Sequence, residues 1–398
     1  MTRPLHVLSV IGHLGFGGAE NRLLALASNI DRNRFAHWTV TPDPFDLGAE
    51  ETAGMLRQYK EAGIDMIHLP KASTAKLSRF AQRVWGLCRT IEQLDIDVID
   101  AHCESAALWG AAAGVLTGRP RIATLYHPHP HALLASKFWS LAEQFIFTSL
   151  DLVITDSALR ACEIQRVGRL KSMDVAVVPN GILPPGPTRD RQTIRRALGL
   201  PGDPNVCVIA QVSTLRESKG HLILLDAAKS VLEADRSAFF LIVGYEKDEP
   251  GFKERVERRI AELGISDRVR ITGYPGPIGD VWSIVDIHVH ASMFDSLPNA
   301  IIEGMSLGKP AVVTAVGGIP DAVTHGKTGL IVPPADSASL AAALIHLLRN
   351  PSLATALGQA ALSRYQQTYR PDVMARKLES CFVGVSRGCS PTSLLCRD

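Results

Sequence analysis

The sequence lacks a strong excess of either charge and lacks regularly spaced cysteines. Its 398 residues include 42 Lys and Arg against 40 Asp and Glu, a formal net charge of +2. Such a balanced chain has no polycationic character, so we expect no nucleic-acid partner. The seven cysteines are odd in number and never spaced C-x-x-C, which argues against a disulfide framework and against a structural zinc site. Free thiols suit a reducing compartment, and we expect a cytoplasmic protein.

Long hydrophobic runs are also missing, although 46% of the residues are hydrophobic. No uncharged apolar stretch approaches the roughly 20 residues that a membrane helix needs. Residues 106–117 come nearest, and they are rich in Ala and Gly. The run at 5–11 is short, contains His6 and leads into a glycine loop, which does not fit a signal peptide. We expect no membrane-spanning helix, and enough apolar surface for two cores.

Short apolar runs alternate with helical patterns along the chain. We predict strands at residues 5–11, 38–41, 66–69, 98–101, 121–126, 152–155 and 175–178, and then at 206–212, 239–243, 269–272, 287–289, 311–314 and 330–332. Strands that alternate with helices form parallel sheets covered on both faces. A proline- and glycine-rich run at 179–187 separates the two groups of strands.

The predicted fold class is therefore α/β, with two doubly wound Rossmann-like domains. We place the first at residues 1–183, the second at 184–383 and a tail of unknown role at 384–398, and the final helix could pack back on the first domain. Ligands of such sheets bind beyond the carboxyl ends of the strands. We expect the strand-end loops of both domains to face one central cleft.

The most informative segment is residues 295–304, which reads Asp-Ser-Leu-Pro-Asn-Ala-Ile-Ile-Glu-Gly. Asp295 and Glu303 are eight positions apart, and Pro298 between them is a favourable first residue of a helix. Asp295 should lie in the loop before this helix and Glu303 about a turn and a half inside it. The amides of Asn299 and Ala300 would point out of the helix start, where the helix dipole favours a phosphate group. A nucleoside diphosphate sugar fits this arrangement.

This segment and the sequence after it resemble glycosyltransferase family 4, also called group 1. The acidic-x7-acidic signature is followed, in the family's order, by an apolar run at 308–314, a glycine loop at 317–321 and a turn and strand at 326–332. Pro-Asn-Gly at 179–181 resembles the family's interdomain motif, and the resemblance covers about residues 5–370. It implies the GT-B fold and a retaining, metal-independent hexosyltransferase that needs no cofactor. The donor would be a UDP- or GDP-linked sugar, and the acceptor a hydroxyl group of a lipid-linked glycan or polysaccharide precursor.

A glycine-rich loop follows the first predicted strand, at residues 12–20. It misses the G-x-G-x-x-G register of a dinucleotide site, because Leu14 and Glu20 stand where glycines are required. An NAD-dependent oxidoreductase therefore loses most of its support. The family's Gly-Gly-Ala-Glu loop closes over the donor diphosphate or an acceptor, so the resemblance assigns Gly17 and Gly18 to the donor site. A loop whose glycines only allow a turn is the alternative.

The resemblance places cations at the diphosphate. Lys219 and Gly220 match the family's strand-end loop, but Thr214 stands where the family has arginine, and Arg216 is our candidate substitute. Each well-placed donor would stabilise the departing diphosphate by about 3–4 kcal/mol. Read without the family, a basic loop of this kind is solvated surface.

Residues of both domains complete the expected site. Glu303 matches the family glutamate that binds the ribose hydroxyls, and Asp295 matches the carboxylate nearest the donor sugar, where glutamate is commoner. His127 and His102 follow strands of the first domain, where the family carries histidines; histidines bonded in loop packing are the alternative. Tyr274 stands where the family lines the base pocket. The expected catalytic residues are His127, Asp295, Arg216 and Lys219, the donor-binding ones Gly17, Gly18, Tyr274, Leu297, Pro298, Asn299, Ala300 and Glu303, and the acceptor-side one His102.

Three other patterns imitate metal sites. His-Pro-His-Pro-His at 127–131 forms an extended loop without a carboxylate in step. His288 and His290 share the H-x-H of metal-dependent hydrolases, which place it on the first strand of a barrel. Asp95 and Asp97 precede a strand rather than follow one, as a polar connection would. We expect no metal site.

Residues 77–94 predict an amphipathic helix accompanied by Lys76, Arg79, Arg83 and Arg89. The plain interpretation is a helix packed on its own sheet with a solvated basic face. The alternative is a face that rests on an anionic membrane surface, at the inner side of the membrane, which would suit a lipid-linked acceptor. A nucleotide-sugar-binding protein without transfer activity is the other open alternative.

Overall fold

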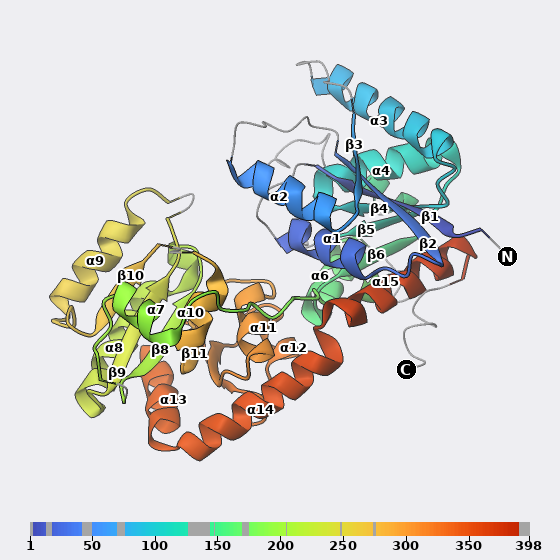
Figure 1. Cartoon of the computed structure of the whole chain (residues 1–398). Helices are drawn as coiled ribbons and strands as arrows, with labels where there is room; N and C mark the ends of the chain where they lie inside the picture. The colour runs from blue at the N-terminus through green and yellow to red at the C-terminus, as the bar shows by residue number, and fades with distance from the viewer. Residues whose placement is uncertain are drawn as a thin grey trace. The chain divides into compact units, whose positions relative to one another are not determined.

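The computed structural model describes residues 3–12, 18–41, 50–69, 76–125, 144–146, 148–168, 175–203, 205–246, 249–273 and 276–389. The chain forms two compact units (Figure 1). The first unit is built from Met1–Ile182 together with Arg370–Asp398, and the second from Leu183–Tyr369. The division lies beside the predicted boundary at 183. The predicted second domain at 184–383, however, includes a last helix that belongs to the first unit.

The first unit contains a parallel sheet in the order β3-β2-β1-β4-β5-β6-β7. Val7 of β1 pairs with Val98 of β4, and Leu5 of β1 pairs with Phe35 of β2. The central strands are short and almost wholly buried, because helices cover both faces of a doubly wound sheet. The strands are β1 (Leu5–Ile11), β2 (Phe35–Thr41), β3 (Asp65–His68), β4 (Val98–His102), β5 (Arg121–Thr124), β6 (Leu152–Thr155) and β7 (Val175–Val177).

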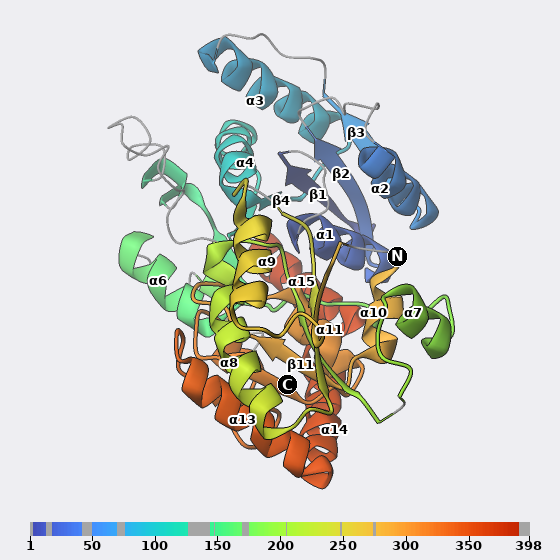
Figure 2. The ribbon, with the colours of Figure 1, turned by 90° about the vertical axis from the view of Figure 1, so that its left-hand side faces the viewer.

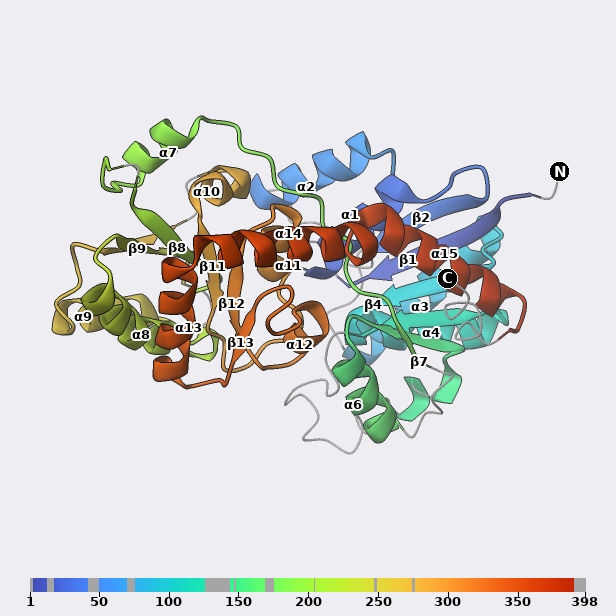
Figure 3. The ribbon, with the colours of Figure 1, turned by 90° about the horizontal axis from the view of Figure 1, so that it is seen from below.

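Two apolar cores flank this sheet. One packs α3 and α4 against the face that carries Leu8 and Ile99. The other packs α1 and α15 against the face that carries Val7 and Val98, and α15 runs beside α1 in Figures 1 and 3. The last helix thus supplies part of the first unit's core. The helices of this unit are α1 (Gly18–Asn29), α2 (Glu50–Glu61), α3 (Lys76–Gln93), α4 (Cys103–Thr117), α6 (Ala158–Gly168) and α15 (Pro371–Ser386).

The second unit contains a parallel sheet in the order β10-β9-β8-β11-β12-β13, and Figure 3 shows β8, β11, β12 and β13 side by side. The strand order reverses between β8 and β11, so the loops after these two strands lie at the topological switch point where such sheets bind ligands. The strands are β8 (Cys207–Val212), β9 (Ala238–Val243), β10 (Val269–Thr272), β11 (Ile287–His290), β12 (Ala311–Thr314) and β13 (Leu330–Val332).

Helices cover both faces of the second sheet as well. One core joins α8, α9 and α13 (Figure 2), and the other joins α7 and α10 with part of α11. His288 and His290 of β11 lie on the second of these faces, because Ile287 and Val289 belong to the first core and neighbouring strand residues face opposite ways. The helices are α7 (Arg191–Ala197), α8 (His221–Ala234), α9 (Phe252–Glu262), α10 (Ile278–Ile284), α11 (Asn299–Ser306), α12 (Ile319–Ala322), α13 (Ser337–Arg349) and α14 (Pro351–Thr368), with a 3-10 turn at Glu217–Lys219.

The segment that enters the second unit is tied to α10 by one buried carboxylate. Asp280 accepts hydrogen bonds from the backbone and side chain of Thr188 (2.6 and 3.1 Å) and from Arg189 Nε (2.8 Å). These bonds lower the pKa of Asp280 to about 2. Gly279 lies against Gly186 so closely that a Cβ at 279 would be 2.0 Å from the carbonyl oxygen of Gly186. The chain around residues 186–189 is therefore fixed to the second unit.

Within the described ranges, no single helix is both long and apolar enough to cross a bilayer. Helix α13 and the segment of α14 and α15 are long and apolar enough only when they are taken together, and the chain bends by 103° between them.

Candidate active site

Two loops of the second unit meet at the switch point because of Gln211, the penultimate residue of β8. Its side-chain amide donates to the carbonyl of Lys219 (2.8 Å), and its Oε1 accepts the N–H of Ala291 (3.2 Å). Gly220 makes the close approach possible: its φ is +69°, and a Cβ there would lie 2.0 Å from the carbonyl oxygen of Ala291. Gln211 and Gly220 thus join the loop after β8 to the loop after β11.

His221 supports the same junction as a neutral ring. Its Nδ1 lies 3.0 Å from Gln211 Nε2 and its Nε2 lies 3.1 Å from the carbonyl of Thr214. Burial lowers the pKa of His221 to about 4, so at neutral pH Nδ1 accepts and Nε2 donates. Two uncharged side chains, Gln211 and His221, therefore support the loop that carries Lys219.

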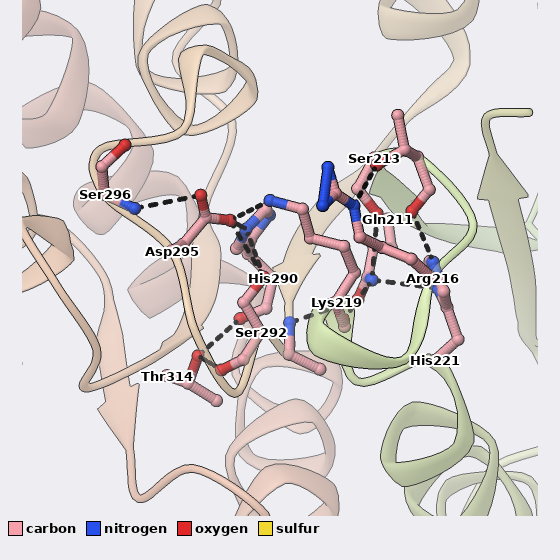
Figure 4. A network of polar contacts seen from close by, with 12 residues as sticks. Gln211, Ser213, Arg216, Lys219, His221, His290, Ser292, Asp295, Ser296 and Thr314 are labelled. Carbon is pink, nitrogen blue, oxygen red and sulfur yellow. Dashed lines mark hydrogen bonds and ion pairs between the residues drawn. The ribbon is translucent and has the colours of Figure 1, made fainter. Parts of the chain in front are cut away.

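Asp295 is the centre of a polar network (Figure 4). Its Oδ2 accepts a hydrogen bond from Lys219 Nζ, one from Ser292 Oγ (3.1 Å) and one from His290 Nε2 (3.1 Å). Its Oδ1 accepts the backbone N–H of Ser296 (3.1 Å). Asp295 and Lys219 are largely buried, with 11% and 16% of their side chains exposed. The carboxylate and the ammonium group predicted at the donor thus form an ion pair with each other.

This network keeps Asp295 ionised. Burial acts to raise the pKa of Asp295, but the hydrogen bonds and charges of His290 and Lys219 outweigh burial and hold the pKa well below its usual range. Thr314 of β12 fixes the backbone under the network, because its Oγ1 donates to the carbonyl of Ser292 (2.6 Å). The ionised Asp295 carboxylate is held beside the Lys219 ammonium group.

The helix that follows Asp295 begins one residue later than we predicted. Pro298 is the residue before the first helical turn rather than its first member, with φ −64° and ψ 130°, and α11 starts at Asn299. The loop before α11 is fixed by Gly318, whose N–H donates to the carbonyl of Ser296 (2.7 Å). Leu297 is buried. The order of acid, loop and helix start is as predicted, and Leu297 serves as an apolar anchor.

Glu303 lies on α11 and is held from an unexpected direction. Trp282 of α10 donates its indole N–H to Glu303 Oε2 (2.8 Å). Burial raises the pKa of Glu303, and the bond from Trp282 opposes that rise. One carboxylate oxygen is therefore occupied from within the protein. The sequence contained no signal for this pairing, since 21 residues separate the two side chains.

Arg216 and Thr214 lie together on the loop after β8. Arg216 Nε donates weakly to Thr214 Oγ1 (3.4 Å), and Arg216 is the residue before the 3-10 turn that carries Lys219. The candidate substitute and the position that it would replace are thus adjacent in space as well as in sequence.

The first unit contributes a buried pair instead of an exposed histidine. His102 has no exposed surface, and its Nε2 lies 3.0 Å from Asp100 Oδ2, which is equally buried. The acceptor-side role of His102 stays a prediction, and in this structure its side chain is enclosed on strand β4. Gly18 opens helix α1, whereas Gly17, His127 and Tyr274 lie outside the described residues.

Family models match both units of the chain. The model for glycosyltransferase family 4 matches residues 16–184, and the model for glycosyl transferases group 1 matches residues 190–364. The chain belongs to glycosyltransferase family 4. The two matches divide close to residue 183, where the structure divides the chain.

Curated relatives of this family-4 chain match it over part of their length. The D-inositol 3-phosphate glycosyltransferase of Corynebacterium urealyticum is 28% identical over 67% of this chain and 66% of that protein. The mannosylfructose-phosphate synthase of Agrobacterium fabrum is 26% identical over 53% of this chain and 48% of that protein. This chain thus spans less than two thirds of the length of these relatives.

Solved structures resemble the family-4 chain over nearly its whole length. A glycosyltransferase from Rickettsia africae has a TM-score of 0.80 at 18% identity and covers 96% of this chain and 99% of its own. Anabaena HepE, solved in complex with UDP, has a TM-score of 0.80 at 21% identity and covers 96% of this chain and 100% of its own. These likenesses show that the fold is GT-B, as predicted.

The basic helix of this family-4 chain differs from the predicted solvated face. Arg83 is buried, and its guanidinium group lies over the ring of Trp109, 4.3 Å from the centroid. Trp85 instead is 61% exposed, with Arg89 over its ring at 4.8 Å. Arg83 therefore belongs to the packing of α3 on α4, and Trp85 and Arg89 are on the surface.

The patterns that imitated metal sites have other surroundings in the structure. Among the described residues, no group of three or more His, Cys, Asp or Glu side chains could hold a metal ion. Asp95 and Asp97 pair with Arg3 at 3.1 and 2.7 Å. The histidine and proline run at 127–131 lies outside the described residues.

Proposed function

We propose that this protein is a glycosyltransferase that moves a sugar from a nucleoside diphosphate donor to a hydroxyl acceptor with retention of configuration. The observation that carries the proposal is the meeting of Lys219, Asp295 and the start of α11 at the switch point of the second sheet. A cation beside a helix N-terminus suits a diphosphate. The carboxylates on either side suit the hydroxyls at the two ends of a nucleotide sugar.

Each side chain has a defined task in this proposal. Lys219 binds the diphosphate and stabilises the negative charge that grows on it as the bond to the sugar breaks. Glu303 accepts hydroxyl bonds from the ribose with the oxygen that Trp282 leaves open. Asp295 accepts a sugar hydroxyl on Oδ1, which has one protein donor, whereas Oδ2 has three. Arg216 and His127 complete the expected set, at the diphosphate and the sugar.

The retaining course proposed here needs no covalent intermediate. The acceptor oxygen bonds to the anomeric carbon on the face from which the diphosphate departs, and a diphosphate oxygen takes the acceptor proton. The bonding pair of the broken bond stays with the diphosphate, whose added charge Lys219 and Arg216 offset. A divalent metal is then unnecessary, since side-chain cations stabilise the leaving group.

The comparisons bear on the donor and on the acceptor in different ways. Anabaena HepE has been solved with UDP and with UDP-glucose, which favours testing UDP-linked donors first. Two relatives are named for inositol 3-phosphate and mannosylfructose-phosphate. Small phosphorylated acceptors are therefore tested beside a lipid-linked acceptor. For a lipid-linked acceptor, exposed Trp85 with Arg89 is the part of α3 suited to an anionic bilayer surface.

Binding of nucleoside diphosphates tests the donor site. We expect UDP or GDP to bind in calorimetry and to raise the melting temperature, since ligand at a hundredfold its Kd adds about 2.7 kcal/mol. Lys219→Gln should weaken that binding roughly 10- to 100-fold, because it removes a charged hydrogen-bond donor. Lys229→Gln is the matched control, as Lys229 is exposed and pairs with Glu233 on α8. Failure of UDP, GDP, ADP and dTDP to bind would overturn the donor site.

Turnover tests the chemistry. Arg216→Ala should lower turnover about 100- to 1000-fold, as expected for a lost transition-state donor, whereas Thr214→Ala and the exposed control Arg236→Ala should have little effect. Transfer should survive EDTA. The acceptors tested in this assay are inositol phosphate and a lipid-linked glycan. Activity that disappears with EDTA and returns with Mn²⁺ would contradict the metal-free course, and donor binding without transfer to any acceptor would favour a binding protein.

A further inference from the structure

Strand β11 presents two histidines on one face, and only one of them reaches the site. The rings of His288 and His290 lie 6.0 Å apart. His290 bonds Asp295 and Ser292 through Nε2, whereas neither ring nitrogen of His288 has a hydrogen-bond partner among the described residues. The proposed chemistry gives neither ring a task. The difference between them indicates that the bond from His290 to Asp295 is specific to the site.

The direction of each bond follows from the chemistry of the groups. A carboxylate without a proton only accepts, so His290 Nε2 must carry the hydrogen that points at Asp295 Oδ2. Ser292 donates its hydroxyl to the same oxygen (3.1 Å) and can therefore accept from the imidazole, whose Nε2 lies 2.9 Å away. His290 Nδ1 has no partner among the described residues. With its hydrogen on Nε2, the ring shares this one donor between Asp295 Oδ2 and Ser292 Oγ.

The three donors divide the Asp295 carboxylate into two unlike oxygens. Oδ2 accepts from Lys219, Ser292 and His290, which leaves it no capacity for a ligand. Among the described residues, Oδ1 accepts only the N–H of Ser296, which leaves one lone pair for a further donor. The orientation of the Asp295 carboxylate decides which of its two oxygens is available to a ligand. Of the three donors to Oδ2, His290 is the one that lies on strand β11.

We propose that His290 is a positioning residue for the donor sugar: it holds Asp295 so that Oδ1 presents its free lone pair to a sugar hydroxyl while Oδ2 stays bonded to Lys219. This inference rests on the proposed function and deepens it. It also explains the short side chain at 295. A glutamate would carry its carboxylate about 1.5 Å farther, out of reach of an imidazole that already stands 3.1 Å from Oδ2.

The experiment compares a nucleoside diphosphate with its sugar conjugate in six forms of the protein. These are the wild type, His290→Leu, His290→Gln, Asp295→Asn, the double variant of His290→Leu and Asp295→Asn, and His288→Leu, which removes an imidazole from the same face of the same strand. The ligands are UDP and UDP-glucose, or GDP and GDP-mannose if the protein binds GDP. Binding is measured by calorimetry, and kcat/KM by release of the nucleoside diphosphate.

The expected result is a split between the two ligands. His290→Leu should weaken the nucleotide sugar and lower kcat/KM about 10- to 100-fold, as expected for a lost bond to a charged group, and should change the diphosphate alone by less than about 3-fold. The effect should nearly vanish in the Asp295→Asn background, because His290 acts through Asp295. His290→Gln, which keeps an N–H donor, should recover part of the loss, and His288→Leu should match the wild type in both ligands.

Two results would overturn the inference and can be told apart. Equal weakening of diphosphate and nucleotide sugar, or effects of His290→Leu and Asp295→Asn that multiply independently, would make His290 a packing residue and leave the proposed function intact. A wild type that binds neither nucleotide would remove the proposed function and the inference together.

Discussion

Asp295 and Glu303, the two carboxylates of the α11 region, have opposite pKa shifts. Burial acts to raise the pKa of both carboxyl groups. Asp295 receives a hydrogen bond and a charge from His290 and from Lys219, which together outweigh burial, whereas Glu303 receives one neutral donor, Trp282. Glu303 therefore takes up a proton at a higher pH than an ordinary glutamate does, and Asp295 at a lower one.

This difference predicts how nucleotide binding depends on pH. Affinity for UDP or GDP should fall with acidification through the pKa of Glu303, which lies above its ordinary value of 4.5, because a protonated carboxyl loses an acceptor for the ribose. Trp282→Phe removes the N–H that stabilises the charged form, so the midpoint should move to higher pH and the affinity at neutral pH should drop roughly 5- to 10-fold. Calorimetry across pH 5 to 8 checks both, in buffers of roughly constant ionic strength.

Trp85→Phe is the control for that experiment, since its ring is exposed on α3. A midpoint that stays in place or moves down in Trp282→Phe would contradict the assigned role of the indole.

At the residue scale, the sequence predicted the groups that lie in one local motif. Spacing and family resemblance indicated Asp295, Glu303 and Lys219, and the structure brings Asp295 and Lys219 into contact. Their supports were missed for a physical reason: Gln211, Trp282 and His290 act across the fold, and no local pattern reports such contacts. His290 is part of an H-x-H pattern with His288. By itself that pattern indicates a metal site and not a hydrogen-bond donor to a carboxylate.

At the scale of elements, the junction between the loops after β8 and β11 depends on backbone shape. Gly220 combines a φ of +69° with a Cβ position 2.0 Å from the carbonyl oxygen of Ala291. Gly264 has a nearly identical φ of +66°, yet nothing lies within 4 Å of its Cβ position. Comparing substitutions at these two glycines distinguishes the free-energy cost of a left-handed backbone from the free-energy cost of a steric clash.

Alanine at each of these positions should give different results. Gly264→Ala should destabilise the protein by about 1 kcal/mol, the cost of a left-handed alanine. Gly220→Ala should cost at least about 2 kcal/mol more, because the backbone must shift, and should weaken UDP or GDP binding by moving Lys219. Urea unfolding and calorimetry provide the two readouts. Equal losses of stability, with normal nucleotide binding by Gly220→Ala, would show that the close approach is dispensable.

The tie between α10 and residues 188–189 predicts a second dependence on pH. The pKa of Asp280 in the folded protein is about 2, below its ordinary 3.8, so its contribution to stability is present above about pH 4 and is lost as pH falls toward 2. Asp280→Asn should therefore be less stable than the wild type at pH 7, and the difference should shrink below pH 4. Asp267→Asn, at an exposed pair with Arg236, is the control for urea unfolding. A difference independent of pH would refute the role of the charge.

Element positions were predicted best where a strand coincides with a continuous apolar run. Strand β1 has the predicted bounds Leu5–Ile11, and β12 begins and ends within the predicted run at 311–314. Strand β2 begins three residues before its predicted start at Trp38, because Ala36 and His37 do not continue the apolar run. The helix after Asp295 begins at Asn299 because Pro298 has extended backbone angles. Local composition sets the middle of an element, and tertiary contacts set its ends.

At the scale of the whole molecule, the first unit is completed by the last helix of the chain. Phe382 of α15 has no exposed surface and lies edge-on to Phe35 of β2, with ring centroids 6.4 Å apart. Phe382→Ala should therefore destabilise the first unit by about 3–5 kcal/mol, the usual cost of removing a buried aromatic side chain. Hydrogen exchange should report faster opening in β1 and β4 than in the wild type, with β8 and β11 unchanged. Faster exchange confined to the second unit would contradict this assignment of α15.

The control for Phe382→Ala is Phe252→Ala, at a buried phenylalanine that begins α9 in the second unit. It should give the reverse pattern of exchange. The prediction placed this helix in the second domain by sequence order and left open that it packs on the first, because no local pattern says which of two sheets a terminal amphipathic helix covers.

Because α15 is the last helix of the chain, the first unit can be completed only at the end of synthesis. On the ribosome, every residue of the second unit is synthesised before Met374, Leu378 and Phe382, which cover Val7, Val98 and Ile122 of the first sheet. At 5–20 residues per second, that interval lasts about 10 to 40 s. During it the nascent first sheet lacks the α15 part of the cover on one apolar face, while the second unit can already close. In a newly made chain, the first sheet therefore stays incompletely covered for longer than the second sheet. In a cell short of chaperones, aggregation or degradation of this protein should begin at the first sheet.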